Sequence, residues 1–124
     1  WTAPEPSLFT SPQSPLSAKR DPGTGTIVAV WNPIPNYNGR AQIRDGAWTG
    51  GRTPLVLATS NDETKHWSDP VVIEDDPDSG YCYTAIHFTD SAMLLAYCAG
   101  GIEDRGCLNR LRIRRIALDE LPLA

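Results

Sequence analysis

Cys82-Tyr83-Thr84-Ala85-Ile86, a turn, and Met93-Leu94-Leu95-Ala96-Tyr97 form one of two similar hairpin patterns in this chain of 124 residues. The other is Ser14-Pro15-Leu16-Ser17-Ala18, a turn, and Ile27-Val28-Ala29-Val30-Trp31. These runs are short, and they contain many β-branched and aromatic residues, which favour strands. A hairpin that recurs with further strands between its copies indicates repeated four-stranded units.

Clusters of turn residues separate the predicted strands, which are Thr26–Trp31, Pro54–Thr59, Val71–Glu74, Tyr83–Phe88, Ala92–Cys98 and Leu108–Ile116. No helix of three turns is evident, so the predicted fold class is all-β. Four-stranded antiparallel repeats are typical of β-propeller blades. We therefore predict an extended, Pro-rich leader over residues 1–13, a first blade over residues 14–78 and a second over residues 79–124.

Two blades cannot close a propeller, because a closed ring needs roughly four to eight. The chain should therefore either belong to a longer protein whose N-terminal blades are missing here, or associate with copies of itself. It also begins at Trp1 without a Met. We expect a processed or truncated product. Its secretion signal could have been removed, so the sequence does not determine the cellular compartment.

The charge balance argues against two classes of partner. Lys and Arg total 11 against 15 Asp and Glu, a formal net charge of -4. No basic excess suggests binding to nucleic acid or to an anionic membrane. No apolar stretch approaches the ~18–20 residues of a membrane-spanning helix. We expect neither a nucleic-acid nor a membrane partner.

The three cysteines, Cys82, Cys98 and Cys107, are too few and too irregular for a disulfide scaffold or a zinc site. Buried free thiols are favoured, and a single Cys82–Cys98 bridge across a hairpin is the alternative. The two histidines, His66 and His87, come with no acidic partner at ligand spacing. We expect no metal, and no glycine-rich loop indicates a nucleotide cofactor.

The last predicted strand alternates, with Leu111 and Ile113 on one face and Arg110, Arg112 and Arg114 on the other. Such an arginine stripe could bind phosphates. The favoured interpretation is an exposed strand whose charges prevent pairing at the sheet edge.

The turn Ser60-Asn61-Asp62-Glu63-Thr64-Lys65-His66-Trp67 resembles the Asp-box of sialidases and related propellers, Ser-x-Asp-x-Gly-x-Thr-Trp. Ser60, Asp62 and Trp67 match, while Thr64 replaces the Gly and His66 replaces the Thr. The Asp side chain should bond backbone N–H groups of its own turn. Without the Gly, this position of the turn should adopt a positive φ less easily. In the family this turn is structural and lies far from the catalytic face.

A longer resemblance surrounds this turn. Roughly residues 12–118 resemble the last two blades of six-bladed bacterial sialidase-like proteins, including Gly51-Arg52-Thr53-Pro54-Leu55 and the stretch from Tyr81 to Tyr97. The resemblance implies a glycoside hydrolase, an exo-α-sialidase, that releases terminal sialic acid from glycans. It is also compatible with a secreted or periplasmic bacterial protein.

The resemblance implies roles for two residues. Arg52 would belong to an arginine triad that grips the sialic acid carboxylate, and Tyr83 would be the nucleophile, activated by a neighbouring Glu. An arginine offers two parallel donors to a carboxylate, and sialidases with a Tyr nucleophile are known exceptions to the two-carboxylate rule. The remaining catalytic groups come from earlier blades, so the isolated chain should be inactive.

Arg40, Arg44 and Trp48 lie in a Gly-rich loop over residues 38–51, on the same predicted face, and are weaker candidates for sugar binding. Two alternatives to the enzyme remain open. The chain could be a glycan-binding propeller module without the nucleophile system. It could also be a structural module in which Arg52 and Tyr83 only pack.

Overall fold

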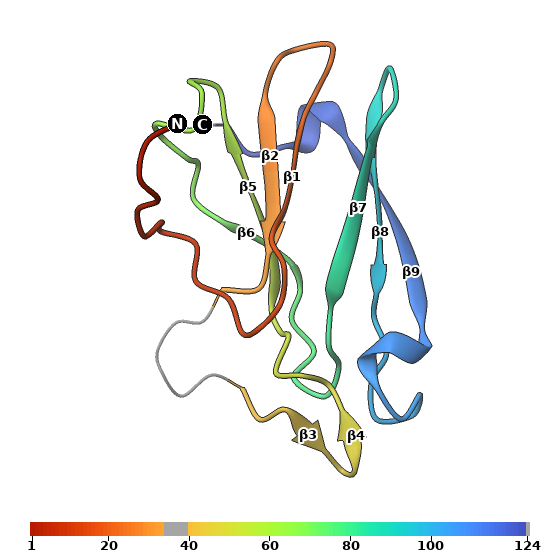
Figure 1. Ribbon diagram of the computed structural model, residues 1–124. Helices are drawn as coiled ribbons and strands as arrows, with labels where there is room; N and C mark the ends of the chain where they lie inside the picture. The colour runs from red at the N-terminus through yellow and green to blue at the C-terminus, as the bar shows by residue number, and fades with distance from the viewer. Residues whose placement is uncertain (34–39, 124) are drawn as a thin grey trace.

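The computed structural model describes residues 1–33 and 40–123, and its two larger sheets, both antiparallel, face each other (Figure 1). The first sheet has the order β1-β2-β5-β6. Its strands are β1 (Ser17–Arg20), β2 (Ile27–Trp31), β5 (Leu55–Ser60) and β6 (Val71–Glu74). The predicted all-β fold with antiparallel sheets is confirmed.

The second sheet has the order β7-β8-β9 and three strands in the described part of the chain. They are β7 (Cys82–Phe88), β8 (Ala92–Cys98) and β9 (Leu111–Ala117). The prediction of four strands in this unit is wrong for the described residues. The last strand also begins later than predicted, because Cys107–Asn109 form a short 3-10 helix, η1. A second one, η2, spans Leu118–Glu120.

A small hairpin of β3 (Ile43–Arg44) and β4 (Ala47–Trp48) lies within the connection between β2 and β5. This connection, the β6–β7 connection and the β8–β9 connection gather at one end of the sheets (Figure 1). The turn over residues 61–70 lies at the opposite end, together with the β1–β2 and β7–β8 turns. The loops of Arg52 and Tyr83 thus lie away from the Asp-box-like turn, as the sequence predicts.

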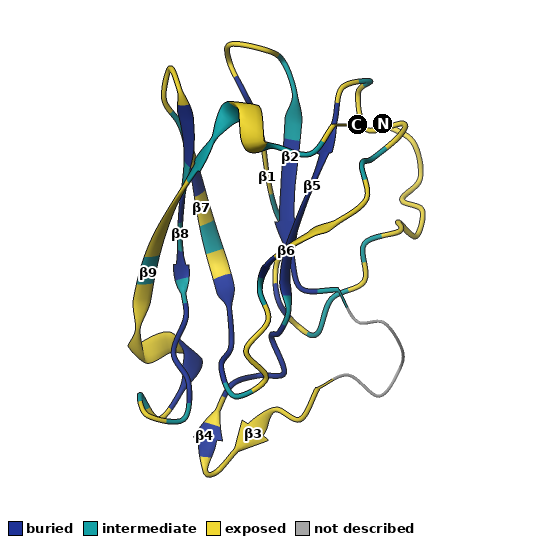
Figure 2. Ribbon diagram, turned by 180° about the vertical axis from the view of Figure 1, so that it is seen from behind, coloured by how far each residue is buried: buried dark blue, intermediate teal, exposed yellow. Residues whose placement is uncertain are grey.

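Apolar side chains fill the space between the two sheets. They come from both, and the cluster consists of Val28, Val30, Leu55, Leu57, Ile73, Tyr81, Ile86, Met93, Leu95, Tyr97 and Ala99. The other face of the first sheet carries a smaller cluster of Ala29, Trp31, Val56 and Ala58, against which Phe9 and Trp67 pack. β2 and β5 are therefore buried on both faces (Figure 2), which explains their almost continuous apolar sequences.

The leader over residues 1–13 contains no strand or helix, yet it is attached to the first sheet. The Phe9 ring lies edge-on to Trp31 at 4.8 Å and to Trp67 at 5.1 Å between ring centroids. Edge-to-face pairs of this kind contribute about 0.5–1.5 kcal/mol beyond their buried area. Phe9 thus ties the leader to the Asp-box-like turn.

The arginine face of β9 points toward the first sheet, yet β9 is an edge strand with four of its seven residues exposed, Arg114 among them, as the sequence predicts. Arg112 forms an ion pair with Glu74 at 2.7 Å, and Arg114 donates to the Ile73 carbonyl at 2.5 Å. Glu74 also accepts a hydrogen bond of 2.6 Å from the Tyr97 hydroxyl, whose pKa is raised by burial. These arginines have protein partners, and Leu111 and Ile113 face outward instead.

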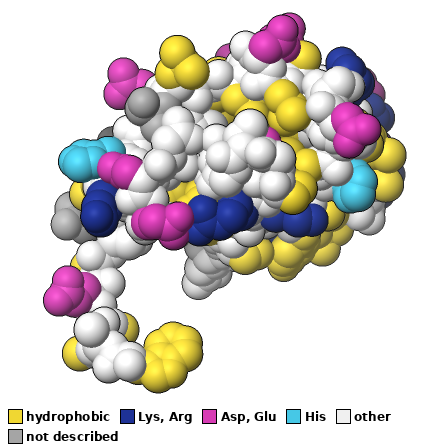
Figure 3. All heavy atoms as spheres, turned by 90° about the horizontal axis from the view of Figure 1, so that it is seen from above, with side chains coloured by type: hydrophobic (Ala, Val, Ile, Leu, Met, Phe, Trp, Pro, Cys, Tyr) yellow, Lys and Arg dark blue, Asp and Glu magenta, His cyan; other side chains and the backbone are white. Residues whose placement is uncertain are grey.

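Charges of both signs are interspersed over the end of the molecule that carries the 61–70 turn (Figure 3). No helix in the described part of the chain is long and apolar enough to cross a membrane.

Candidate functional site

Arg52 follows a tight turn at the end of the β3–β4 hairpin. Gly50 and Gly51 adopt φ values of 68° and 66° there, a left-handed conformation that glycine adopts without strain. A Cβ atom on Gly51 would also lie 2.5 Å from the Arg40 carbonyl oxygen. This turn directs the Arg52 side chain back into the protein, where the residue is only 5% exposed.

Hydrogen bonds from two directions fix the Arg52 backbone. Its carbonyl accepts one of 3.1 Å from the Asn32 side chain, at the end of β2, and one of 2.7 Å from the Tyr81 N–H, just before β7. The Asn32 amide is itself oriented by Ser14, whose hydroxyl donates to it at 2.8 Å. The position of Arg52 is therefore set by both sheets.

The structure brings three of the predicted site residues together. The Arg52 guanidinium carbon lies 4.8 Å from the centroid of the Trp48 ring and 5.2 Å from that of the Tyr83 ring. Cations are attracted to aromatic faces at such distances, and the attraction grows when the cation is desolvated. We call Arg52, Trp48 and Tyr83 the Arg52 cluster.

The guanidinium of Arg52 keeps unused hydrogen-bonding capacity. Its Nη2 donates to the Gln13 carbonyl of the leader at 2.9 Å. Its Nε and Nη1 atoms are buried and have no hydrogen-bond partner in the described part of the chain. Buried donors are rarely left unpaired, because each costs roughly 1–3 kcal/mol. Within the described residues, these two nitrogens are therefore available to a further acceptor, with the Cys82 and Tyr83 side chains close by.

A planar guanidinium binds a carboxylate through two parallel N–H groups. One such pair consists of Nη1 and Nη2, and the other of Nε and Nη2, so Nη2 is common to both. The leader carbonyl of Gln13 accepts from one of the two N–H groups of that shared nitrogen. The other N–H of Nη2, together with Nε or Nη1, would offer a carboxylate a two-point contact.

Tyr83 has an unusual backbone. Its φ is 56°, and the β7–β8 register is irregular between Cys82 and Ala85. A positive φ is uncommon for a bulky residue, and such outliers cluster at functional sites. Its side chain is 54% exposed, and no carboxylate among residues 1–33 and 40–123 forms a hydrogen bond with it. An activating Glu supplied from elsewhere remains a prediction.

The three cysteines lie near the Arg52 cluster as free thiols, as the sequence favours. Cys82 and Cys98 are direct neighbours in the β7–β8 register but are not bridged. Burial raises the pKa of the Cys82 and Cys107 thiols. Raised thiol pKa values disfavour the reactive thiolate. The described residues contain no group of three or more His, Cys, Asp or Glu that could hold a metal ion.

The structure does not add Arg40 or Arg44 to the Arg52 cluster. Arg44 forms an ion pair of 2.7 Å with Asp78, which ties the β3–β4 hairpin to the β6–β7 connection. Arg40 is exposed, and its carbonyl group and Cβ lie near Gly51. Their predicted roles in sugar binding remain untested.

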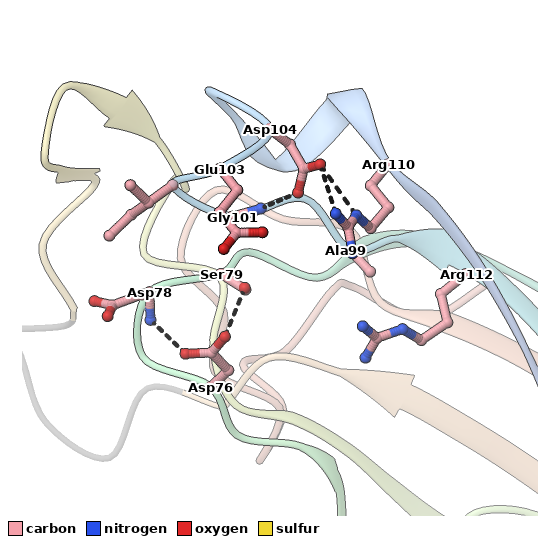
Figure 4. Close-up of a pocket in the computed structure, with 10 residues that line it drawn as sticks. Asp76, Asp78, Ser79, Ala99, Gly101, Glu103, Asp104, Arg110 and Arg112 are labelled. Atoms are coloured by element: carbon pink, nitrogen blue, oxygen red, sulfur yellow. Dashed lines mark hydrogen bonds and ion pairs between the residues drawn. The ribbon is translucent and has the colours of Figure 1, made fainter.

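A polar pocket of about 440 Å³ lies at the same end of the molecule (Figure 4). Its walls come from the β6–β7 and β8–β9 connections and from β9, and include Asp76, Ser79, Glu103, Asp104, Arg110 and Arg112. Much of its hydrogen-bonding capacity is used internally: Asp76 accepts from Ser79 at 2.9 Å, and Asp104 pairs with Arg110 at 2.9 Å. The sequence did not indicate this pocket, because its residues become neighbours only when the loops fold.

The Asp-box-like turn has the hydrogen bonds that its sequence predicts. Asp62 accepts from the backbone N–H of His66 at 2.9 Å and pairs with the His66 ring at 2.5 Å. Ser60 donates to Asp62 at 3.0 Å and accepts from the Thr64 N–H at 3.0 Å. His66 thus adds a side-chain contact to the carboxylate that orders the turn.

Thr64, which replaces the family's Gly, has a φ of 69°. A β-branched residue is strained in this conformation, and glycine is not. We therefore expect Thr64→Gly to increase the free energy of unfolding by about 1 kcal/mol, measured by urea denaturation. Lys65→Gly, at the next position and without a positive φ, should instead be destabilising. A loss of stability in Thr64→Gly would contradict this account of the turn.

The backbone and ring of His66 lower the pKa of Asp62 from 3.8 to about 2. A depressed pKa in the folded state stabilises the protein above the unfolded-state pKa, and this contribution disappears as the pH falls through the folded value. Wild type should therefore exceed Asp62→Asn in stability at pH 5, and the difference should shrink between about pH 4 and pH 2. Urea midpoints across this range measure it. A difference that is independent of pH would contradict the assignment.

A comparison with protein-family models matches residues 1–95 to the BNR repeat-like domain. The match includes the leader, the whole first sheet, the Arg52 cluster and part of the second sheet. No curated protein and no solved structure matched the chain. The matched segment covers more than half of the 124 residues. This chain belongs to the BNR repeat-like domain family.

Proposed function

We propose that this chain recognises the carboxylate of an acidic sugar through Arg52, as part of a sialidase-like propeller that acts on terminal sialic acid. One observation carries the proposal. The Arg52 guanidinium lies close to two aromatic rings, and two of its buried nitrogens, Nε and Nη1, have no hydrogen-bond partner in the described part of the chain. A carboxylate supplies the acceptors that these donors lack.

The surroundings of Arg52 suit such a ligand. Trp48 is 40% exposed, so part of its ring is free to contact the apolar C–H face of a sugar. The Gln13 carbonyl holds the shared nitrogen through a single hydrogen bond. The second N–H of that nitrogen, together with Nε or Nη1, would give a carboxylate a bidentate contact between opposite charges.

The architecture supports a propeller. The first sheet is a four-stranded antiparallel meander, and the second repeats its first three strands. We propose that the two sheets are blades, over residues 14–78 and 79–124. In this arrangement the Arg52 cluster lies at the end opposite the Asp-box-like turn (Figure 1), as the resemblance to sialidases implies.

Hydrolysis with Tyr83 as the nucleophile is a second candidate, favoured by its exposed side chain, its positive φ and its contact with Arg52. The Tyr83 oxygen would attack the anomeric carbon as its proton passes to the activating Glu and an acid protonates the leaving oxygen. Water would then displace the Tyr83 oxygen from the anomeric carbon, which releases the sugar and returns the proton to Tyr83. A neutral phenol avoids the repulsion that the sugar carboxylate would exert on an anionic nucleophile. The acid and the activating Glu would come from blades outside this chain.

Titration of the chain with N-acetylneuraminic acid, followed by tryptophan fluorescence, tests the binding proposal. We expect saturable binding at millimolar ligand, at least tenfold weaker binding in Arg52→Lys, and little change in Tyr83→Phe. The methyl ester of the same sugar is the matched control, since it lacks the charge and should bind at least tenfold more weakly. Because Arg52→Lys alters a buried residue, Trp48→Ala provides a second variant, also with reduced affinity. Equal binding of acid and ester would overturn the proposal.

A separate assay tests hydrolysis, in a full-length protein that contains these residues. Cleavage of a fluorogenic sialoside should fall at least 100-fold in Tyr83→Phe, while affinity for free sialic acid stays near the wild-type value. An unchanged rate would remove Tyr83 from the mechanism. Binding without turnover in the wild-type protein would favour the non-catalytic, glycan-binding alternative.

A further inference from the structure

The Pro-rich leader contacts the Arg52 cluster through one backbone carbonyl, that of Gln13. This carbonyl accepts a hydrogen bond of 2.9 Å from Arg52 Nη2. The other guanidinium nitrogens, Nε and Nη1, have no hydrogen-bond partner in the described part of the chain. Among the described residues, the Gln13 carbonyl is therefore the group that fixes the direction of the guanidinium by a hydrogen bond.

The two aromatic rings of the cluster do not fix this direction. The guanidinium carbon of Arg52 lies 4.8 Å from the Trp48 ring centroid and 5.2 Å from that of Tyr83. The attraction of a cation to a ring depends mainly on its distance from the ring face. It therefore changes little when the guanidinium turns about its carbon atom. A hydrogen bond weakens steeply as its angle changes, so Gln13 supplies the directional contact.

Gln13 has an unusual backbone conformation. Its φ is 37°, and positive φ values are uncommon for residues other than glycine. Its side chain is exposed, so packing of that side chain does not explain the conformation. Residues in such conformations persist where the surrounding structure holds them, and they cluster at functional sites. The contact between the Gln13 carbonyl and Arg52 gives this conformation a role.

Ser14, the next residue, anchors the leader on one side of Gln13. Its hydroxyl donates to the Asn32 side chain at 2.8 Å, and Ser14 itself is buried. The amide nitrogen of Asn32 donates to the carbonyls of Arg52 at 3.1 Å and Pro54 at 3.0 Å. One Asn32 side chain thus holds both the neighbour of Gln13 and the backbone of Arg52. This arrangement fixes the spacing between the Gln13 carbonyl and the arginine.

Phe9 anchors the leader on the other side of Gln13. Its ring lies edge-on to Trp31 and Trp67, and the leader runs from there along the first sheet toward the end that carries Arg52 (Figure 1). Only positions 10–13 separate the two anchors, Phe9 and Ser14. A segment this short, held at both ends, keeps little conformational freedom. The Gln13 carbonyl is therefore held in place before any ligand binds.

We infer that Gln13 is a positioning residue, whose backbone carbonyl orients the Arg52 guanidinium and thereby raises the affinity of the site for a carboxylate. An arginine side chain has many rotamers, and immobilising such a side chain on binding costs affinity. The carbonyl removes this cost in advance. It accepts from one N–H of Nη2 and leaves the second N–H for the ligand. The inference rests on the proposed function and adds the leader to its site.

Two substitutions at Gln13 test the inference, because both remove the same exposed side chain and only one can keep the backbone conformation. Glycine adopts a positive φ without strain, whereas proline fixes φ near −65° and turns the carbonyl away. The Gln13 N–H donates no hydrogen bond to the described residues, so proline removes none there. Gln13→Pro should weaken binding of N-acetylneuraminic acid roughly threefold to tenfold. Gln13→Gly should stay near the wild-type affinity in the same fluorescence titration.

NMR spectroscopy of the ligand-free protein gives a second readout, the Arg52 Nε–H signal, identified through Arg52→Lys. Gln13→Pro should shift and broaden this signal, because the guanidinium loses its fixed direction, and Gln13→Gly should leave it at the wild-type position. Glu5→Pro, at an exposed leader position, is the control for a new proline and should change neither readout. Ser14→Ala releases one anchor without altering Gln13, and it should change both readouts in the same direction as Gln13→Pro.

Three outcomes would overturn the inference. One is an Arg52 signal that is the same in ligand-free Gln13→Pro and wild type. Another is equal affinity of Gln13→Gly and Gln13→Pro for the acid. The third is tighter binding in Gln13→Pro, because the carbonyl would then compete with the ligand. A wild-type chain that binds no acid would instead remove the proposed function, and the ligand-free signal would still decide whether Gln13 orients Arg52. Circular dichroism of each variant verifies that the fold is retained.

Discussion

One backbone carbonyl, that of Arg52, connects the two sheets at the end where their loops gather. It accepts hydrogen bonds from Asn32 at the end of β2 and from Tyr81 just before β7. The guanidinium of the same residue lies against Trp48 from the β3–β4 hairpin and Tyr83 from the second sheet. The geometry of the site therefore depends on the relative position of the sheets, which the apolar core between them maintains.

Much of the fold follows from local patterns. The strand runs, the hairpins and the hydrogen bonds of Asp62 depend on residues close together in sequence, so they could be predicted. The sequence also placed Arg52 and Tyr83 at one end of the sheets. It could not predict that Trp48 would contact Arg52, or that the carbonyl of Gln13 would reach it, because these contacts join segments whose relative position depends on packing.

β9 is the exposed edge strand that the sequence predicts, but its pattern leaves the direction of its two faces open. The alternation of apolar and basic residues correctly assigned Leu111 and Ile113 to one face and Arg112 and Arg114 to the other. It does not determine which of the two faces points inward. The prediction assigned the arginines to solvent, as is usual for charged residues. In the structure Glu74 and the Ile73 carbonyl provide partners for them, and the apolar residues are left exposed.

The central proposal is that Arg52 binds a carboxylate through guanidinium nitrogens that have no hydrogen-bond partner in the described part of the chain. NMR spectroscopy of the arginine side chains, with the Arg52 Nε–H signal identified through Arg52→Lys, tests it most directly. The account predicts that N-acetylneuraminic acid shifts this signal in a saturable manner and that its methyl ester does so at least tenfold more weakly. A signal that stays unchanged at saturating acid would contradict the claim.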